Sequence, residues 1–188
     1  FPNLILSNPF NLKSSAGFDA IAQGVESLIS MKSDEASVMY AKKSLKLSLN
    51  NYLPFLQKPN KENSKNMLLA SNLAGKAINI SKTTAPHAVS YPFSSMFGID
   101  HGHAVSITLE KFLLFNFKNI NYSKSKFNLL NRYKIIFKLF NVINIGELNN
   151  KIKFLKREAQ LIDEYSKLGI DINQSMNKIL NQINELRL

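Results

Sequence analysis

Apolar residues recur at intervals of three and four along nearly the whole chain, and this helical spacing constrains the fold more than any other feature. Residues 3–6 (Asn-Leu-Ile-Leu) form the one short β-like run, and a single strand cannot make a sheet. The 188 residues are enough for one domain with a sizeable core. We therefore predict an all-α bundle of about seven or eight helices, preceded by a short N-terminal strand.

Capping residues and glycines divide the pattern into segments. Asp34 and the run Thr84-Ala-Pro86 are typical of helix starts. Gly98, Gly146 and Gly169 mark breaks between helices. The predicted helices cover residues 18–29, 35–49, 66–81, 84–97, 101–116, 123–140, 147–167 and 171–186.

Cysteine is absent, which excludes a disulfide scaffold, thiolate catalysis and Cys-ligated zinc. The most apolar run, residues 112–117, is interrupted by Asn116 and followed by Lys118. It is far shorter than the roughly 18 apolar residues of a membrane span. We expect a soluble protein without a membrane segment.

The chain carries 24 basic and 13 acidic residues, a net charge of +11. Only 3 of the basic residues are arginine, and arginine makes most bidentate contacts to bases and phosphates, so specific nucleic-acid binding is disfavoured. Residues 111–146 hold seven basic residues and no acidic one. This stretch is most simply a solvated lysine face. The alternative is a basic helical module that binds nucleic acid or an anionic membrane through residues 111–138.

The three histidines all fall between positions 87 and 103. Asp19 and Gln23 are four residues apart and share a helix face, as do His87 and Tyr91. His101 follows a glycine turn that can return it toward His87. One carboxylate and two imidazoles are a common zinc or iron site, with an amide oxygen as a weak fourth ligand. The alternative is a hydrogen-bonded core histidine beside an aspartate that favours a helix N-terminus.

Two motifs in this region match a known family. Residues 14–27 (Ser-Ser-Ala-Gly-Phe-Asp-Ala-Ile-Ala-Gln-Gly-Val-Glu-Ser) resemble the Gly-x-Asp-Ala stretch that ends in Glu-Ser in the iron-containing (group III) alcohol dehydrogenases. Pro86-His87-Ala88, followed by His101-Gly102, resembles their second signature. Residues 77–92 and 101–105 are most similar to the phosphonoacetaldehyde reductase branch.

The resemblance implies a two-domain cytoplasmic enzyme, in which a nucleotide-binding α/β domain precedes an all-helical metal domain and catalysis occurs between them. The chain has no Gly-Gly-Gly-Ser-type phosphate loop and is similar to the second domain only. Residues 1–13 would be a remnant of the crossover from the missing domain, and residues 14–188 the metal-binding catalytic domain. We expect the full enzyme to be a homodimer and this fragment alone to be inactive.

The resemblance also implies roles for individual residues. Asp19, His87 and His101 match metal ligands, whereas Gln23 occupies the position of a histidine in most metal-dependent members. Tyr91, our candidate catalytic residue, stands where many relatives have a histidine near the nicotinamide. His103 has no counterpart, and it either orients His101 or is exposed.

The implied reaction is hydride transfer between NAD(P)H and a small aldehyde or primary alcohol such as phosphonoacetaldehyde, with an iron or zinc ion polarising the carbonyl. Lys82, Thr83 and Thr84 precede a helix start and would bind an anionic substrate group such as a phosphonate. They are otherwise a surface lysine with capping threonines. The rival functional hypothesis is a non-catalytic remnant of this fold that has lost metal and cofactor binding.

Overall fold

The computed structural model describes residues 2–183, and within that range the chain is helical and contains no strand. The prediction of an all-α bundle is confirmed. The helices are α1 (Asn3–Leu6), α2 (Phe10–Ile29), α3 (Glu35–Gln57), α4 (Lys61–Ser81), α5 (Ala85–Phe97), α6 (His101–Lys118), α7 (Leu129–Phe140), α8 (Ile145–Glu158) and α9 (Ile172–Asn181).

The N-terminal strand prediction is wrong, because residues 3–6 form the single helical turn α1. Among residues 2–183 no strand is available to pair with this run, and a helical turn satisfies its backbone locally. Pro2 already has helical dihedral angles (φ −56°, ψ −29°) and directs the chain into that turn. The turn packs against α4.

Several other boundaries differ from the sequence prediction: α3 continues to Gln57 instead of ending at residue 49, α4 begins at Lys61 instead of residue 66, and α7 begins only at Leu129 instead of residue 123. Helix α2 begins at Phe10, directly after Pro9, and is eight residues longer at its start than expected. Helix α8 ends at Glu158, and Gln160 then adopts a left-handed conformation with φ 56°. The predicted end of the last helix, Leu186, lies outside the described residues, and α9 ends at Asn181.

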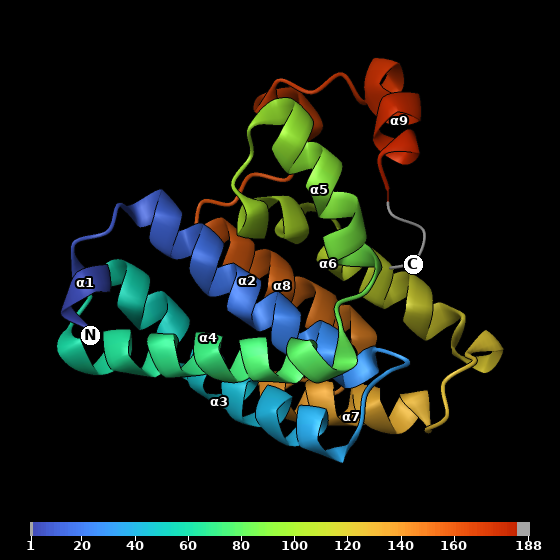
Figure 1. Cartoon of the computed structure of the whole chain (residues 1–188), viewed down its shortest axis with the longest axis horizontal. Helices are drawn as coiled ribbons and strands as arrows, with labels where there is room; N and C mark the ends of the chain where they lie inside the picture. Colours follow the sequence, from blue (N-terminus) through green and yellow to red (C-terminus); the bar gives the residue numbers. More distant parts are fainter. Residues whose placement is uncertain (1, 184–188) are drawn as a thin grey trace.

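Helix α2 is the centre of the bundle. It packs against α3, α4 and α6, and Figure 1 shows it running between the α3–α4 layer and the α5–α6 pair. Most of its residues are buried, so a polar side chain on α2 sits where the other helices converge. Tyr52 of α3 fixes the start of this helix, since its buried hydroxyl donates a 2.7 Å hydrogen bond to the Ser14 carbonyl.

The apolar core consists of two clusters. The larger one joins α2, α3, α4, α6, α7 and α8 and includes Phe18, Leu45, Tyr133 and Leu148. The smaller one lies under α5 and α9, with members Phe93, Ala104, Ile107, Ile170 and Ile179. Helix α6 contributes to both clusters and connects them.

A buried lysine connects α8 to α6. Lys156 donates hydrogen bonds to Glu110 Oε2 at 2.9 Å, to Asp163 Oδ2 at 2.6 Å and to the Ser106 carbonyl at 3.2 Å. Partial burial alone would raise the pKa of Asp163, but the ammonium group of Lys156 outweighs it and holds that pKa below its usual value. This ion-pair network anchors the segment after α8 against α6.

None of the described helices is long and apolar enough to cross a membrane.

Candidate metal centre

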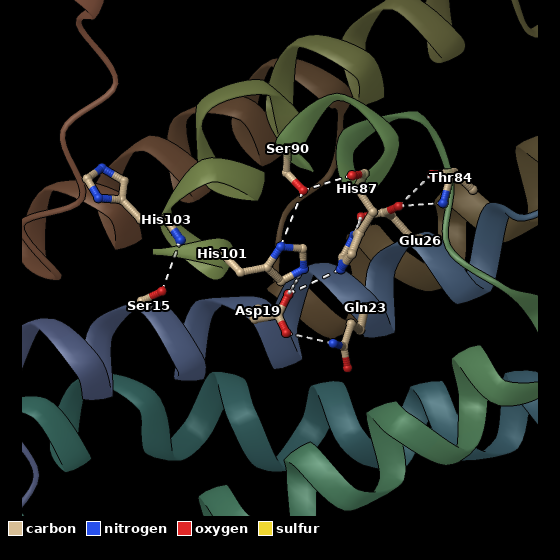
Figure 2. A network of polar contacts seen from close by, with 9 residues as sticks. All are labelled: Ser15, Asp19, Gln23, Glu26, Thr84, His87, Ser90, His101 and His103. Carbon is tan, nitrogen blue, oxygen red and sulfur yellow. Dashed lines mark hydrogen bonds and ion pairs between the residues drawn. The ribbon is translucent and has the colours of Figure 1, made fainter. Parts of the chain in front are cut away.

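Three helices bring Asp19, His87 and His101 to one point. Asp19 lies in the middle of α2, His87 in the first turn of α5, and His101 at the first position of α6. Asp19 Oδ1 is 3.2 Å from His87 Nε2 and 3.9 Å from His101 Nε2. One donor atom from each residue lies within 4.8 Å of the other two (Figure 2).

Two buried donor atoms of this cluster have each other as ion-pair partner and no well-formed hydrogen bond. Asp19 Oδ1 and His87 Nε2 face each other at ion-pair distance, but neither makes a hydrogen bond of acceptable geometry. Buried polar atoms are nearly always satisfied, so such a pair requires an explanation. A cation bound to both atoms satisfies them, and metal–ligand bonds of about 2.0–2.2 Å bridge separations of this size after small side-chain adjustments.

Glu26 positions the His87 ring. This fully buried carboxylate lies 2.5 Å from His87 Nδ1 through Oε1, while its Oε2 accepts hydrogen bonds from the Thr84 amide at 2.6 Å and hydroxyl at 2.8 Å. With Nδ1 held by Glu26, Nε2 points toward Asp19 (Figure 2). A carboxylate on the non-ligating nitrogen is the usual partner of a metal-binding histidine.

Glu26 is a site residue that was not predicted from the sequence. It belongs to the family motif, and it lies seven residues after Asp19 on α2. That spacing of two helical turns was the available signal, because it places both carboxylates on one face.

The local charges favour a cation. Burial disfavours the charged form of His87, but Glu26 and Asp19 outweigh burial and raise the pKa of His87 to about 10. For His101, burial is the main influence and lowers its pKa, with the neighbouring His87 adding to the effect against the opposing carboxylates. Two carboxylates therefore face two imidazoles, of which Glu26 and His87 are buried while Asp19 and His101 are partly exposed toward the cleft.

The position of His101 depends on a close crossing of α6 over α2. A Cβ atom on Gly102 would lie 2.0 Å from the Ser15 carbonyl oxygen, so only glycine allows this approach. The His103 backbone amide also donates to Ser15 Oγ at 3.1 Å. On its other side, His101 Nδ1 lies 3.5 Å from Ser90 Oγ.

The other predicted residues have distinct positions. Gln23 faces the cluster and donates from Nε2 to Asp19 Oδ2 at 2.6 Å. The Tyr91 ring is 5.6 Å from the His101 ring, centroid to centroid, and is half exposed. His103 points away from His101, with its ring nitrogen 2.6 Å from the Ile162 carbonyl (Figure 2).

The cleft beside the cluster is lined in part by Lys82, Thr83 and Thr84. The backbone amide and the hydroxyl of Thr84 already donate hydrogen bonds to Glu26. Thr84 precedes α5 as predicted, yet its side chain makes no capping hydrogen bond to that helix. Lys82 Nζ donates to the Asn79 carbonyl at 2.9 Å and is exposed.

The cleft has a volume of about 1010 Å³ and reaches from His87 and His101 to the end of α6. Among the described residues that line it, Lys32, Lys82 and Lys124 are charged and none is acidic. Large exposed apolar side chains also line it, namely Met31, Tyr91, Phe115 and Tyr122.

Comparison with known proteins supplies the decisive observation. The family model for the C-terminal part of the Fe-containing alcohol dehydrogenases matches residues 13–182. The chain belongs to this family. The match covers all three residues of the cluster, and the resemblance inferred from the two motifs is confirmed.

Individual relatives of this chain agree with the family assignment. It is 31% identical over 100 residues to a phosphonoacetaldehyde reductase of Streptomyces viridochromogenes, which covers 52% of the chain and 25% of the relative. It is 28% identical over 106 residues to a 4-hydroxybutyrate dehydrogenase of Clostridium kluyveri, covering 55% of the chain and 29% of the relative.

Solved structures extend the likeness to the whole chain. A sulfoacetaldehyde reductase of Bifidobacterium kashiwanohense in complex with NAD+ is 25% identical with a TM-score of 0.83, and the match covers 100% of this chain and 47% of that one. An alcohol dehydrogenase of Oenococcus oeni has the same fold, with a TM-score of 0.85 at 18% identity over 96% of the chain and 47% of its own. The chain thus spans about half of these structures, and the curated matches span about a quarter of each relative.

Proposed function

We propose that this chain is the metal-binding helical half of an NAD(P)-dependent reductase that converts a small aldehyde bearing an anionic group to the primary alcohol. The observation that carries the proposal is the convergence of Asp19, His87 and His101 from three helices, with two buried donor atoms that make no well-formed hydrogen bond. A non-catalytic remnant would have no need to keep this convergence.

The donor set suits a divalent transition metal. A carboxylate with two imidazoles is a ligand set used for iron and zinc, and the chain has no thiolate to favour softer ions. Asp19, His87 and His101 would hold the ion, and Glu26 would orient His87. When bound, the ion acts as a Lewis acid toward a substrate carbonyl oxygen.

The cleft beside these residues is proposed to receive the substrate and the nicotinamide end of the cofactor. The nicotinamide nucleotide itself would be bound mainly by a separate nucleotide-binding domain, which would cover the exposed apolar side chains of the cleft and exclude water from it. In the proposed reduction, hydride goes to the carbonyl carbon and a proton goes to the carbonyl oxygen. Tyr91, beside His101 on the cleft wall, is the side chain we assign to that proton transfer.

An anionic substrate group fits the charge of the cleft. The three lysines would attract a phosphonate, sulfonate or carboxylate, and no acidic side chain among the described lining residues opposes them. The names of three relatives describe substrates with one such group each, phosphonoacetaldehyde, sulfoacetaldehyde and 4-hydroxybutyrate. Because Thr84 is occupied by Glu26, we assign the anion to the lysines rather than to the start of α5.

Metal binding by the purified chain tests the proposal directly. We expect one Fe²⁺ or Zn²⁺ per chain in calorimetric titration of metal-free protein, and loss of binding by at least two orders of magnitude in Asp19→Ala and His87→Ala. His103→Ala is the matched control, because His103 lies outside the cluster and should leave affinity unchanged. Equal affinity in all four proteins would refute the metal site.

A further inference from the structure

Gln23 and Asp19 form a pair on one face of α2. Gln23 lies one helical turn after Asp19, and its amide nitrogen donates a 2.6 Å hydrogen bond to Asp19 Oδ2. The other oxygen, Oδ1, faces His87 and His101. The two oxygens of this one carboxylate therefore have separate partners.

The amide nitrogen of Gln23, and not its oxygen, faces the cluster of Asp19, His87 and His101. This orientation is unsuitable for binding a metal. An amide nitrogen donates hydrogen bonds but has no free lone pair for a metal, whereas the amide oxygen is the atom that coordinates. Figure 2 shows the Gln23 oxygen directed away from Asp19 and from both imidazoles. In this orientation Gln23 acts on the carboxylate and not on the ion.

We propose that Gln23 is a positioning residue that holds Asp19 through Oδ2, so that the centre has three protein ligands, Asp19, His87 and His101. The inference rests on the proposed metal site and replaces the weak fourth-ligand role expected from the sequence. Three protein ligands leave more positions for water or substrate oxygen than the four-residue pattern that the sequence resemblance implies.

Manganese provides the probe, because Mn²⁺ is paramagnetic, prefers six oxygen and nitrogen ligands, and does not select thioether sulfur. Water bound to Mn²⁺ in the purified chain can be counted by electron spin resonance in isotope-labelled water. With three protein ligands we expect about three bound waters. The dissociation constant comes from the same titration.

Gln23→Met removes both the amide donor and the amide oxygen while keeping the side-chain length. We expect the number of bound waters to stay the same and the Mn²⁺ affinity to fall about tenfold, within the range seen when a partner of a ligand is lost. Gln57→Met, an exposed glutamine at the end of α3, is the matched control and should change neither quantity.

Gln23→His calibrates the measurement. An imidazole at this position adds a ligand, so one bound water should disappear and the affinity should rise by one to two orders of magnitude, on the scale that changes around a metal site produce. This variant confirms that the water count responds to one added protein ligand.

The outcomes separate the inference from the proposed function. If Gln23→Met gains one bound water, Gln23 is a ligand and the inference is wrong. It is equally wrong if Gln23→Met changes neither the water count nor the affinity. If the unaltered chain binds no metal, the proposed function fails, and this inference fails with it.

Discussion

At the scale of single residues, the buried carboxylate of Glu26 connects the cluster of Asp19, His87 and His101 to the start of α5. It accepts two hydrogen bonds from Thr84 and contacts His87 at 2.5 Å. Hydrogen bonds to a charged carboxylate are shorter and stronger than neutral ones, which suits a group that must fix a ring inside the protein. Removing its charge should therefore affect the cluster without changing the shape of the side chain much.

We expect Glu26→Gln to weaken Zn²⁺ binding about 10- to 100-fold, because an amide has only one acceptor oxygen for three donors and no longer opposes the charge of the ion. Competition with a coloured chelator measures the change. Glu35→Gln, an exposed glutamate in the first turn of α3, is the control and should leave binding intact. Unaltered binding by Glu26→Gln would mean that His87 is oriented by its packing alone.

The three cluster residues were predictable from the sequence because histidines are scarce and the two motifs set their order. The structure brings Asp19, His87 and His101 together as expected. Glu26 escaped because a helical pattern shows which face it occupies but not which distant histidine it meets, 61 residues away. The direction of the Gln23 amide likewise depends on its neighbours in space.

At the scale of helices, the crossing of α6 over α2 sets the distance between Asp19 and His101. We expect Gly102→Ala to destabilise the chain by about 1–3 kcal/mol, the usual cost of overpacking, because the added methyl group meets the Ser15 backbone. It should also weaken metal binding, since α6 must move away from α2. Thermal unfolding and metal titration give the two quantities.

Gly75→Ala is the matched control for that substitution. Gly75 lies inside α4, and an added Cβ there meets no atom within 4 Å. Alanine should therefore stabilise the chain by up to about 1 kcal/mol through its higher helix propensity. If both substitutions had the same effect, the crossing would not depend on contact between the two backbones.

The ion-pair network of Lys156 gives an acid-dependent contribution to stability. The pKa of Asp163 is lowered in the folded chain, so its contribution is present above the unfolded pKa of about 4 and is lost as the pH falls through the folded value. Asp163→Asn should cost up to about 1 kcal/mol at pH 7, because the group is partly exposed and screened, and less at pH 3. Urea unfolding at the two pH values checks this, with Asp100→Asn as an exposed control. A cost that is the same at both pH values would contradict the assignment.

Helix boundaries are harder to predict from sequence patterns than the helices themselves. Long periodic segments such as α3, α4 and α6 were predictable because each buries a stripe of apolar residues. The four residues of α1 carry no such stripe. Despite their β-like composition they form a helical turn, because the part of the chain that the structure describes offers no strand to pair with them. The stop at Glu158 depends on a left-handed Gln160, a residue type that rarely adopts this conformation.

At the scale of the whole molecule, Asp19 and His87 lie on helices that pack into different apolar clusters of the core. Asp19 is on α2, which is packed into the larger apolar cluster, whereas His87 is on α5, which packs on the smaller one. The helices that pack on a small apolar cluster can separate from it locally while the rest of the molecule stays folded. An ion shared by Asp19 and His87 must leave before α5 can separate from α2.

Binding of an ion by Asp19 and His87 should therefore lower the frequency with which α5 and α9 separate from the rest of the molecule. At a free Zn²⁺ concentration 100 times its dissociation constant, amide hydrogen exchange in α5 and α9 should slow about 100-fold, corresponding to about 2.7 kcal/mol. Helices α3 and α4 belong to the larger apolar cluster. Amide hydrogen exchange in these helices should slow much less at every amide that exchanges through local fluctuation. Equal slowing in all four helices would show that the two clusters open together. In that way the two-part core would let an ion bound at this centre restrict the opening of α5 and α9, in addition to the chemistry proposed for it.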